Sequence, residues 1–155
     1  MAGSPEKAER ARQLGAWASI DYSRENVVQR VLELTDGRKC QVVYDSVGQS
    51  TWQTSLDCVA PRGLLVSFGN ASGPVTGVDL GILAKKGSLF VTRPSLMGYA
   101  DTPERLQAMD DELFAMIETG KLQIDINQRY PLHEAAEAQR ALSARETTGS
   151  TVLLP

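Results

Sequence analysis

The chain has 155 residues, of which 42% are hydrophobic and 23% charged, a size and balance typical of one ordinary folded domain with a sizeable core. Its formal net charge of −3 and pI near 5.2 argue against binding to nucleic acid or to an acidic membrane surface, because both require a basic stripe. No apolar run approaches the length that spans a bilayer, and no signal peptide is recognisable, so we expect a cytoplasmic protein without a membrane partner.

The first predicted elements are a helix, a short strand and a second helix. Ser4 is the expected N-cap of the first helix, because proline and glutamate follow it in the first turn, and Gly15 ends this helix. Residues 17–22 are a strand candidate. Ser23 is the expected N-cap of the second helix, whose valines and leucine recur at helical spacing until residues 36–37.

The middle of the chain predicts a βαβ unit, around which we expect the other elements to be arranged. Two apolar runs, residues 42–48 and 63–70, are typical of buried strands, and residues 50–59 between them have helical length and spacing. Near-continuous apolar strands indicate a parallel sheet that is covered on both faces. Such sheets bind ligands at the carboxyl ends of their strands, which here are residues 46–48 and 68–70.

The second half continues the alternation of helices and strands. Its predicted elements are a short helix at 80–86, an edge strand at 88–93 that is followed by a proline, a long helix at 102–120, a strand at 122–126, an alanine-rich helix at 133–145 and a terminal strand at 151–154. We therefore predict one α/β unit, a Rossmann-like parallel sheet flanked by helices with right-handed crossovers. No G-x-G-x-x-G motif is present, so the first strand, the Gly-rich turn and the first helix of such a fold are lacking.

The reactive residue types form no catalytic or metal-binding motif. Cys40 and Cys58 belong to no Cys-x-x-Cys or Cys/His pattern, so we expect buried free thiols rather than a disulfide or a metal site. His133 is the only histidine, and no carboxylate or nucleophile pattern surrounds it, so we expect a surface residue.

Several segments occur in an order that resembles one known family. These segments are VVYDSVG, RGLLVSFGNASG, LGILAKKGSLFVTRPSL, YPLHEAAEAQRAL and ARETTGSTVLLP. The chain resembles the zeta-crystallin-like NADPH:quinone oxidoreductases of the medium-chain dehydrogenase/reductase superfamily over essentially all 155 residues. The resemblance covers the carboxyl-terminal part of such an enzyme. It implies that residues 1–155 are a partial NADPH-binding domain and that the catalytic amino-terminal domain is absent from this chain.

The resemblance implies a function as well as a fold. Members of this branch reduce a quinone or a related electrophilic carbonyl compound by hydride transfer from NADPH, and they work without zinc. We expect the present chain to be the cofactor-binding fragment of such an enzyme, inactive alone, with no catalytic residue and no metal ligand of its own. An alternative is a non-catalytic dimerisation or interaction module that retains a Rossmann remnant. A methyltransferase would require a Gly-rich first loop, which is lacking.

The resemblance also assigns cofactor-binding residues. The 2′-phosphate and adenosine end of NADPH corresponds to Gly3, Ser4, Lys7 and Tyr22; the nicotinamide end corresponds to Ser46, Phe68, Gly69, Asn70 and Ala71; and Arg145 reaches the cofactor from the last helix. Each residue type also has an explanation without a ligand: a solvated lysine, a half-buried tyrosine, a serine or asparagine in a turn after a strand, and an arginine favoured by a helix C-terminus.

Lys7 shows how the two explanations differ. It lies in the first turn of a helix, where the helix dipole disfavours a cation by a few tenths of a kcal/mol. An anion bound at this turn would reverse the penalty, because the backbone N–H groups and the ammonium would both contact it. The residues near the end of the expected second strand include no carboxylate for a ribose hydroxyl, which favours NADPH over NADH.

The lacking elements lead to a prediction about the sheet. In the usual strand order the first two strands separate the third, here residues 17–21, from the fourth, here residues 42–45. The gap would be roughly 10–15 Å wide, and unpaired buried backbone groups forbid it. We expect these two strands to close on each other, another chain to fill the space, or the third-strand segment to pack loosely. At the other edge, the resemblance implies a homodimer through residues 89–92.

Overall fold

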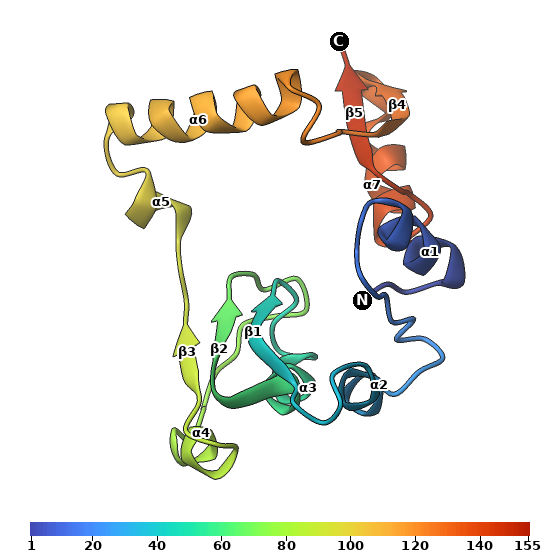
Figure 1. Ribbon diagram of the computed structural model, residues 1–155. Coiled ribbons are helices and arrows are strands. Elements are labelled where there is room, and N and C mark those ends of the chain that lie inside the picture. Colours follow the sequence, from blue (N-terminus) through green and yellow to red (C-terminus); the bar gives the residue numbers. More distant parts are fainter. The chain divides into compact units, whose positions relative to one another are not determined.

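The computed structural model describes all 155 residues and divides into two compact units, Met1–Gly98 and Tyr99–Pro155 (Figure 1). This differs from the single unit that the composition predicts. The physical reason is that the chain forms two separate parallel sheets that share no ladder of hydrogen bonds, one in each unit. The assignment of the whole chain to a partial cofactor-binding domain therefore stays a prediction.

The first unit contains the predicted βαβ arrangement. Strands β1 (Cys40–Asp45), β2 (Val59–Ser67) and β3 (Phe90–Thr92) are parallel and lie in the order β1-β2-β3 (Figure 1). Helix α3 (Trp52–Cys58) connects the first two strands, and the short helix α4 (Gly81–Lys85) precedes the third. The chain therefore has the predicted class, a Rossmann-like parallel sheet flanked by helices.

The core lies on one face of this sheet. Leu56 of α3 packs against Leu65 of β2; both are fully buried, as is Val59, and Leu89 of the same cluster is buried too. Register places Val43, Leu65 and Val91 side by side, so alternate residues of all three strands share this face. Burying each leucine contributes about 2 kcal/mol through removal of apolar surface from water. The opposite face carries exposed aromatic residues, among them Tyr44 (73% exposed) and Phe90 (62%).

Two helices precede the sheet, and only one begins where the sequence predicts. The Ser4 side chain caps α1 (Pro5–Gln13) by accepting a hydrogen bond from Lys7 N at 3.3 Å, as predicted. The predicted cap Ser23 is wrong, since α2 (Val27–Leu34) begins after Asn26, whose side chain accepts from Gln29 N at 3.0 Å. The Ser23 hydroxyl instead donates to Asp21 Oδ1 at 2.6 Å, so the Asp21 carboxylate competes with the helix N-terminus for the Ser23 side chain.

The predicted strand at residues 17–22 is reduced to one parallel bridge between Ala2 and Asp21. Trp17 is 79% exposed, and the only buried apolar side chain is that of Ile20, which packs against Val31 of α2 and Cys58 of α3. Strand β1 pairs with β2 alone, so no continuous six-stranded sheet is present. The segment thus packs through one apolar side chain and does not extend the sheet.

The two cysteines are free, and Cys58 is buried whereas Cys40 is partly buried. Burial, and next the neighbouring Cys40, raise the pKa of the Cys58 thiol to about 11. The thiolate is the nucleophilic form of cysteine, so Cys58 is protonated and unreactive at neutral pH.

The second unit begins with the end of α5 (Leu96–Tyr99) and is built on a two-stranded parallel sheet. Helix α6 (Pro103–Glu118) is capped by Thr102, which accepts from Arg105 N at 3.3 Å. Its further elements are β4 (Ile126–Pro131), the 3-10 turn η1 (Leu132–Glu134), α7 (Ala135–Ser143) and β5 (Ser150–Leu154). The predicted strand at 122–126 is displaced to β4, since Leu122 N donates to Met116 O and continues the end of α6. No helix in either unit has the length and apolar character needed to cross a membrane.

A buried carboxylate fixes the carboxyl end of β1. Asp45 is 5% exposed, and it accepts hydrogen bonds from the backbone N–H groups of Val47 (2.8 Å) and Gly48 (3.0 Å). It also accepts from the hydroxyls of Thr51 (2.8 Å) and Ser55 (2.7 Å), which lie at the start and in the body of α3. Burial raises the pKa of Asp45, but these hydrogen bonds outweigh it and lower the pKa overall.

Replacement of this carboxylate provides a pH-dependent test. Asp45→Asn should lower the free energy of unfolding at pH 7 by about 2 kcal/mol, because the amide accepts fewer of these hydrogen bonds. The folded-state pKa of Asp45 is depressed, so its stabilisation is present above the unfolded-state pKa of about 3.9 and is lost as pH falls through the folded-state value. Urea unfolding should show the difference between wild type and variant shrinking below about pH 4. A difference that is constant from pH 7 to pH 3 would contradict this explanation.

Candidate functional site

The predicted residues at the start of the chain lie together. Gly3, Ser4, Lys7 and Tyr22, here called the α1 cluster, are joined because Tyr22 N donates to Ala2 O at 3.0 Å. A Cβ on Gly3 would lie 2.6 Å from Tyr22 Oη and 3.0 Å from Cζ. Only glycine therefore lets the tyrosine ring lie directly against the backbone at the start of α1.

The α1 cluster has both cationic and anionic groups. Lys7 is partly buried in the first turn of α1, and its backbone N–H is already used by the Ser4 side chain. Glu6 lies beside it on the exposed side of the same turn. Hydrogen bonds from its own backbone N–H and then from Ser4, and more weakly the Arg24 guanidinium, lower the pKa of Glu6. An anion that binds here thus meets Lys7 and Arg24 as attractive charges, and as repulsive charges Glu6 and the Asp21 carboxylate, which lies 3.9 Å from the Arg24 guanidinium.

The second group lies at the carboxyl ends of β1 and β2 and is called the strand-end cluster, formed by Ser46 and residues 68–71. A Cβ on Gly69 would collide with the Ser46 carbonyl and lie 2.7 Å from Ser46 Cα. Phe68 N donates to Asp45 O at 2.8 Å and Ala71 N donates to Ser46 O at 3.3 Å. The two chain segments therefore run in direct backbone contact, which requires glycine at position 69.

Ser72 fastens the same two loops together. Its backbone N–H and its hydroxyl both donate to Val47 O, at 2.7 and 2.8 Å, and its Oγ accepts from Ser50 N at 2.9 Å. Gln49 N donates to Gly73 O at 3.1 Å. These bonds hold the loop after β1 and the loop after β2 in one arrangement, so the side chains on them are preorganised.

Aromatic and polar side chains project from the strand-end cluster. Phe68 is half exposed and contacts Tyr44 edge to face, with ring centroids 6.4 Å apart. The exposed Asn70 carries an amide with both donor and acceptor groups. Arg93, which follows β3, donates through Nη1 to Ser67 O at 2.9 Å and so connects the third strand to this loop.

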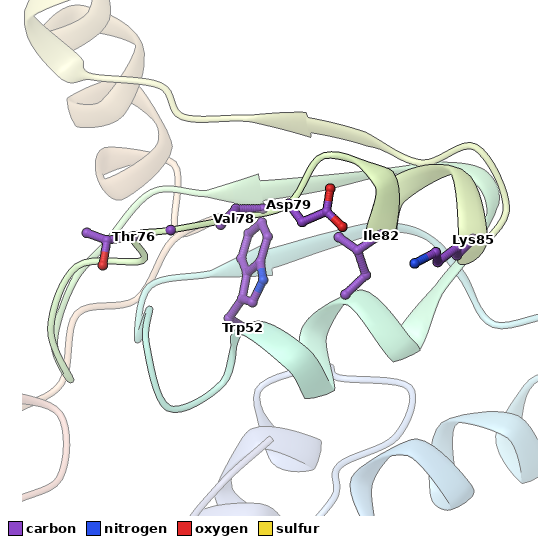
Figure 2. A pocket seen from close by; sticks show the side chains of 7 residues that line it. Trp52, Thr76, Val78, Asp79, Ile82 and Lys85 are labelled. Atoms are coloured by element: carbon purple, nitrogen blue, oxygen red, sulfur yellow. The ribbon is translucent and has the colours of Figure 1, made fainter.

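Two cavities lie beside Trp52, the first residue of α3. One, of about 330 Å³, is bordered by Ser67, Asn70 and Arg93 together with apolar side chains. The other, of about 390 Å³, lies between Trp52 and α4; Figure 2 shows the indole directed toward Val78 and Asp79, with Ile82 beside it. Only the first contains a residue of the strand-end cluster, so it is the better candidate for the ligand that this cluster would bind.

Arg145 belongs to the second unit and follows the C-cap of α7. Its φ of 63° is left-handed, and its N–H donates to Leu142 O at 3.0 Å. Glycine is the usual residue at this position of a helix end, and an L-residue there costs about 1–2 kcal/mol. The structure thus brings all predicted residues except Arg145 into two clusters of the first unit, and their role as cofactor ligands stays a prediction.

Three residues that contact or influence these clusters were not found from the sequence. Asp45 directly follows an apolar strand run, and a carboxylate there could have indicated a loop anchor. Arg93 precedes Pro94, which limits it to extended backbone, but its contact depends on strand register. Arg24 lowers the pKa of Glu6 because the turn after Asp21 brings the two side chains near each other, and no local sequence pattern indicates this proximity. No cluster of three or more histidine, cysteine, aspartate or glutamate side chains that could hold a metal ion is present.

Comparison with known proteins identifies the family. A profile of the zinc-binding dehydrogenase family matches residues 14–153. The quinone oxidoreductase of Pseudomonas aeruginosa is 75% identical over 152 residues, which are 98% of this chain and 47% of that protein. The crystal structure of the quinone oxidoreductase of Pseudomonas syringae pv. tomato superposes with a TM-score of 0.94 at 65% identity, covering 99% of this chain and 47% of that one.

A further crystal structure, that of the Escherichia coli quinone oxidoreductase complexed with NADPH, has a TM-score of 0.94 and 52% identity, and covers 99% of this chain and 48% of that one. The chain spans about half the length of the curated relatives it matches. The family match and these relatives confirm the resemblance seen in the sequence, and the chain belongs to the zinc-binding dehydrogenase family within the medium-chain dehydrogenase/reductase superfamily.

Proposed function

We propose that this chain binds NADPH and forms part of the cofactor site of a quinone reductase that transfers hydride to a quinone or a related electrophilic carbonyl. The observation that carries the proposal is the strand-end cluster, where glycine and an exposed amide stand at the carboxyl ends of two parallel strands. The 52% identity to a protein whose crystal structure is titled as an NADPH complex supports it.

The α1 cluster suits the 2′-phosphate end of NADPH. The Lys7 ammonium supplies positive charge within the first turn of α1, where the helix dipole also favours an anion. The absence of a Cβ on Gly3 leaves room for the Tyr22 ring against the backbone, and the Tyr22 hydroxyl is a further donor. These groups distinguish NADPH from NADH because only NADPH carries the phosphate.

The strand-end cluster suits the nicotinamide end. Gly69 allows close backbone approach, Asn70 can donate and accept hydrogen bonds with a carboxamide, and Phe68 offers an apolar ring surface. NADPH, when bound, supplies the hydride. The residues of this chain bind and orient it, and we propose that residues outside these 155 face the quinone. The isolated chain would then bind cofactor without turnover, and zinc would have no role.

A second candidate function is a non-catalytic dimerisation module. The observation that favours it is strand β3, which pairs with β2 on one side only and exposes Phe90 and Val91. A second copy pairing with this edge would continue the sheet across a two-fold axis. Leu89, the first residue of the predicted dimer segment, is buried in the core and supports the strand from inside. We propose a cytoplasmic homodimer, in keeping with the two free thiols.

Lys7→Glu tests the phosphate site. The wild-type chain should bind NADPH more tightly than NADH. The substitution should weaken the affinity for NADPH about 10–100-fold and leave the affinity for NADH unchanged, because a charge-assisted contact with the phosphate is replaced by repulsion. Isothermal titration measures both affinities. The helix should remain intact, since a carboxylate in its first turn is favourable. Lys85→Glu in α4 is the matched control, and equal affinities of Lys7→Glu and wild type for NADPH would refute the assignment.

Arg145→Gly separates a cofactor role from a structural one. Relief of the left-handed φ should offset the greater chain entropy of glycine, so the free energy of unfolding should stay the same or rise by up to about 1 kcal/mol. The affinity for NADPH should nevertheless fall about 10-fold. Urea unfolding and titration calorimetry give the two quantities. Arg145→Lys keeps the charge and should lose less affinity; a more stable Arg145→Gly variant with unchanged affinity would exclude Arg145 from the site.

Charges on the β3 edge test the dimer. Phe90→Lys combined with Thr92→Lys should give a monomer at micromolar concentration, because like charges would oppose each other across the two-fold axis. Sedimentation velocity measures the state, with Leu80→Lys, an exposed leucine elsewhere in the same unit, as the control. A dimer that persists in the double variant would show that another surface is used.

A further inference from the structure

Arg93 contacts the last residue of β2 and the strand-end cluster through two nitrogen atoms of its guanidinium. Register pairs Leu65 with Val91, so Arg93 follows on the same face as Ser67. Its Nη1 donates to Ser67 O at 2.9 Å. Its Nη2 lies 3.2 Å from the terminal amide of Asn70, in the next turn of the chain. The planar fork of an arginine suits such a pair of contacts, which a lysine cannot make.

The surroundings of Asn70 determine the orientation of its amide. With Oδ1 toward the guanidinium, it accepts from Arg93 Nη2 at 3.2 Å, and Nδ2 donates to Gly69 O at 2.9 Å. The reversed amide would face its oxygen toward the Gly69 carbonyl and its NH₂ toward the arginine donors, so neither group would be satisfied. Arg93 therefore selects one orientation, and it leaves one N–H and one lone pair of Asn70 available to a ligand.

We propose that Arg93 is a positioning residue that fixes the Asn70 carboxamide and, through it, the nicotinamide end of the cofactor; this rests on the proposed function. Arg93 and Asn70 both border the cavity of about 330 Å³ beside Trp52. A carboxamide that is held on two sides loses little rotational freedom when it binds a second carboxamide. Without Arg93 the Asn70 amide can rotate, so the entropy that this amide loses when the ligand binds weakens the affinity.

The test compares two probes and two backgrounds in the full 155-residue chain. Arg93→Leu should bind NADPH about 10-fold more weakly, while the affinity for adenosine 2′,5′-bisphosphate, which lacks the nicotinamide, should change less than 2-fold. In an Asn70→Ala background, Arg93→Leu should lower the affinity for NADPH less than 2-fold, because the Asn70 amide through which Arg93 acts is absent. Arg93→Lys should restore part of the loss. Arg38→Leu, an exposed arginine after α2, is the control.

Other outcomes would overturn the proposal. Unchanged NADPH affinity in Arg93→Leu would do so. Equal losses of affinity for both probes would indicate general damage to the chain. An equal loss of NADPH affinity in the Asn70→Ala background would indicate a role through Ser67 alone. Wild type that binds no NADPH would instead refute the proposed function and the cofactor half of the inference. In that case the side-chain amide signals of Asn70 in ¹⁵N-resolved NMR decide the rest: a shift in Arg93→Leu but not in Arg38→Leu supports the contact, and no shift overturns it.

Discussion

The buried carboxylate of Asp45 is the interaction on which the candidate site depends. Its hydrogen bonds fix the turn after β1 and hold the start of α3 against the end of that strand. This turn provides the Ser46 backbone that Gly69 contacts, so the loop after β2 takes its course from the loop after β1. Ser72 then fastens the two loops together. Backbone and hydroxyl donors satisfy the hydrogen-bonding capacity of this carboxylate, so Asp45 holds the two loops in place from the interior and borders neither cavity beside Trp52.

Local signals predicted much of the fold. The cap Ser4, the long helix that starts near residue 102 and the βαβ unit were found because each depends on residues close in sequence or on simple periodicity. Features that depend on distant partners were not found. A strand at 17–22 requires a neighbouring strand, and without one only Asp21 forms a bridge. Ser23 and Asn26 are equally good capping residues, and the choice between them was made by the Asp21 carboxylate.

The same distinction holds for the candidate site. The strand-end residues could be predicted, since the carboxyl ends of parallel strands are where such folds bind ligands. Their geometry could not, because the role of Arg93 appears only when register sets it beside Ser67 and Asn70. Arg145 shows a different limit: a left-handed arginine after α7 is a conformational outlier, and no sequence pattern distinguishes it from an ordinary arginine at a helix end.

The charges of the α1 cluster determine how it can recognise a phosphate. The Ser4 hydroxyl accepts a hydrogen bond from Lys7 N and donates one to the Glu6 carboxylate, so it is not a free donor, and the selectivity for a phosphate depends on the cations. Glu6 opposes them, and its lowered pKa keeps it ionised across the range in which a phosphate monoester gains its second charge, near pH 6. The charge of Glu6 is therefore constant over that range, so both the repulsion from Glu6 and the attraction from Lys7 and Arg24 grow as the phosphate gains its second charge. Discrimination between a phosphorylated and an unphosphorylated cofactor at this turn thus follows the charge state of the ligand, and the protein contributes a fixed field.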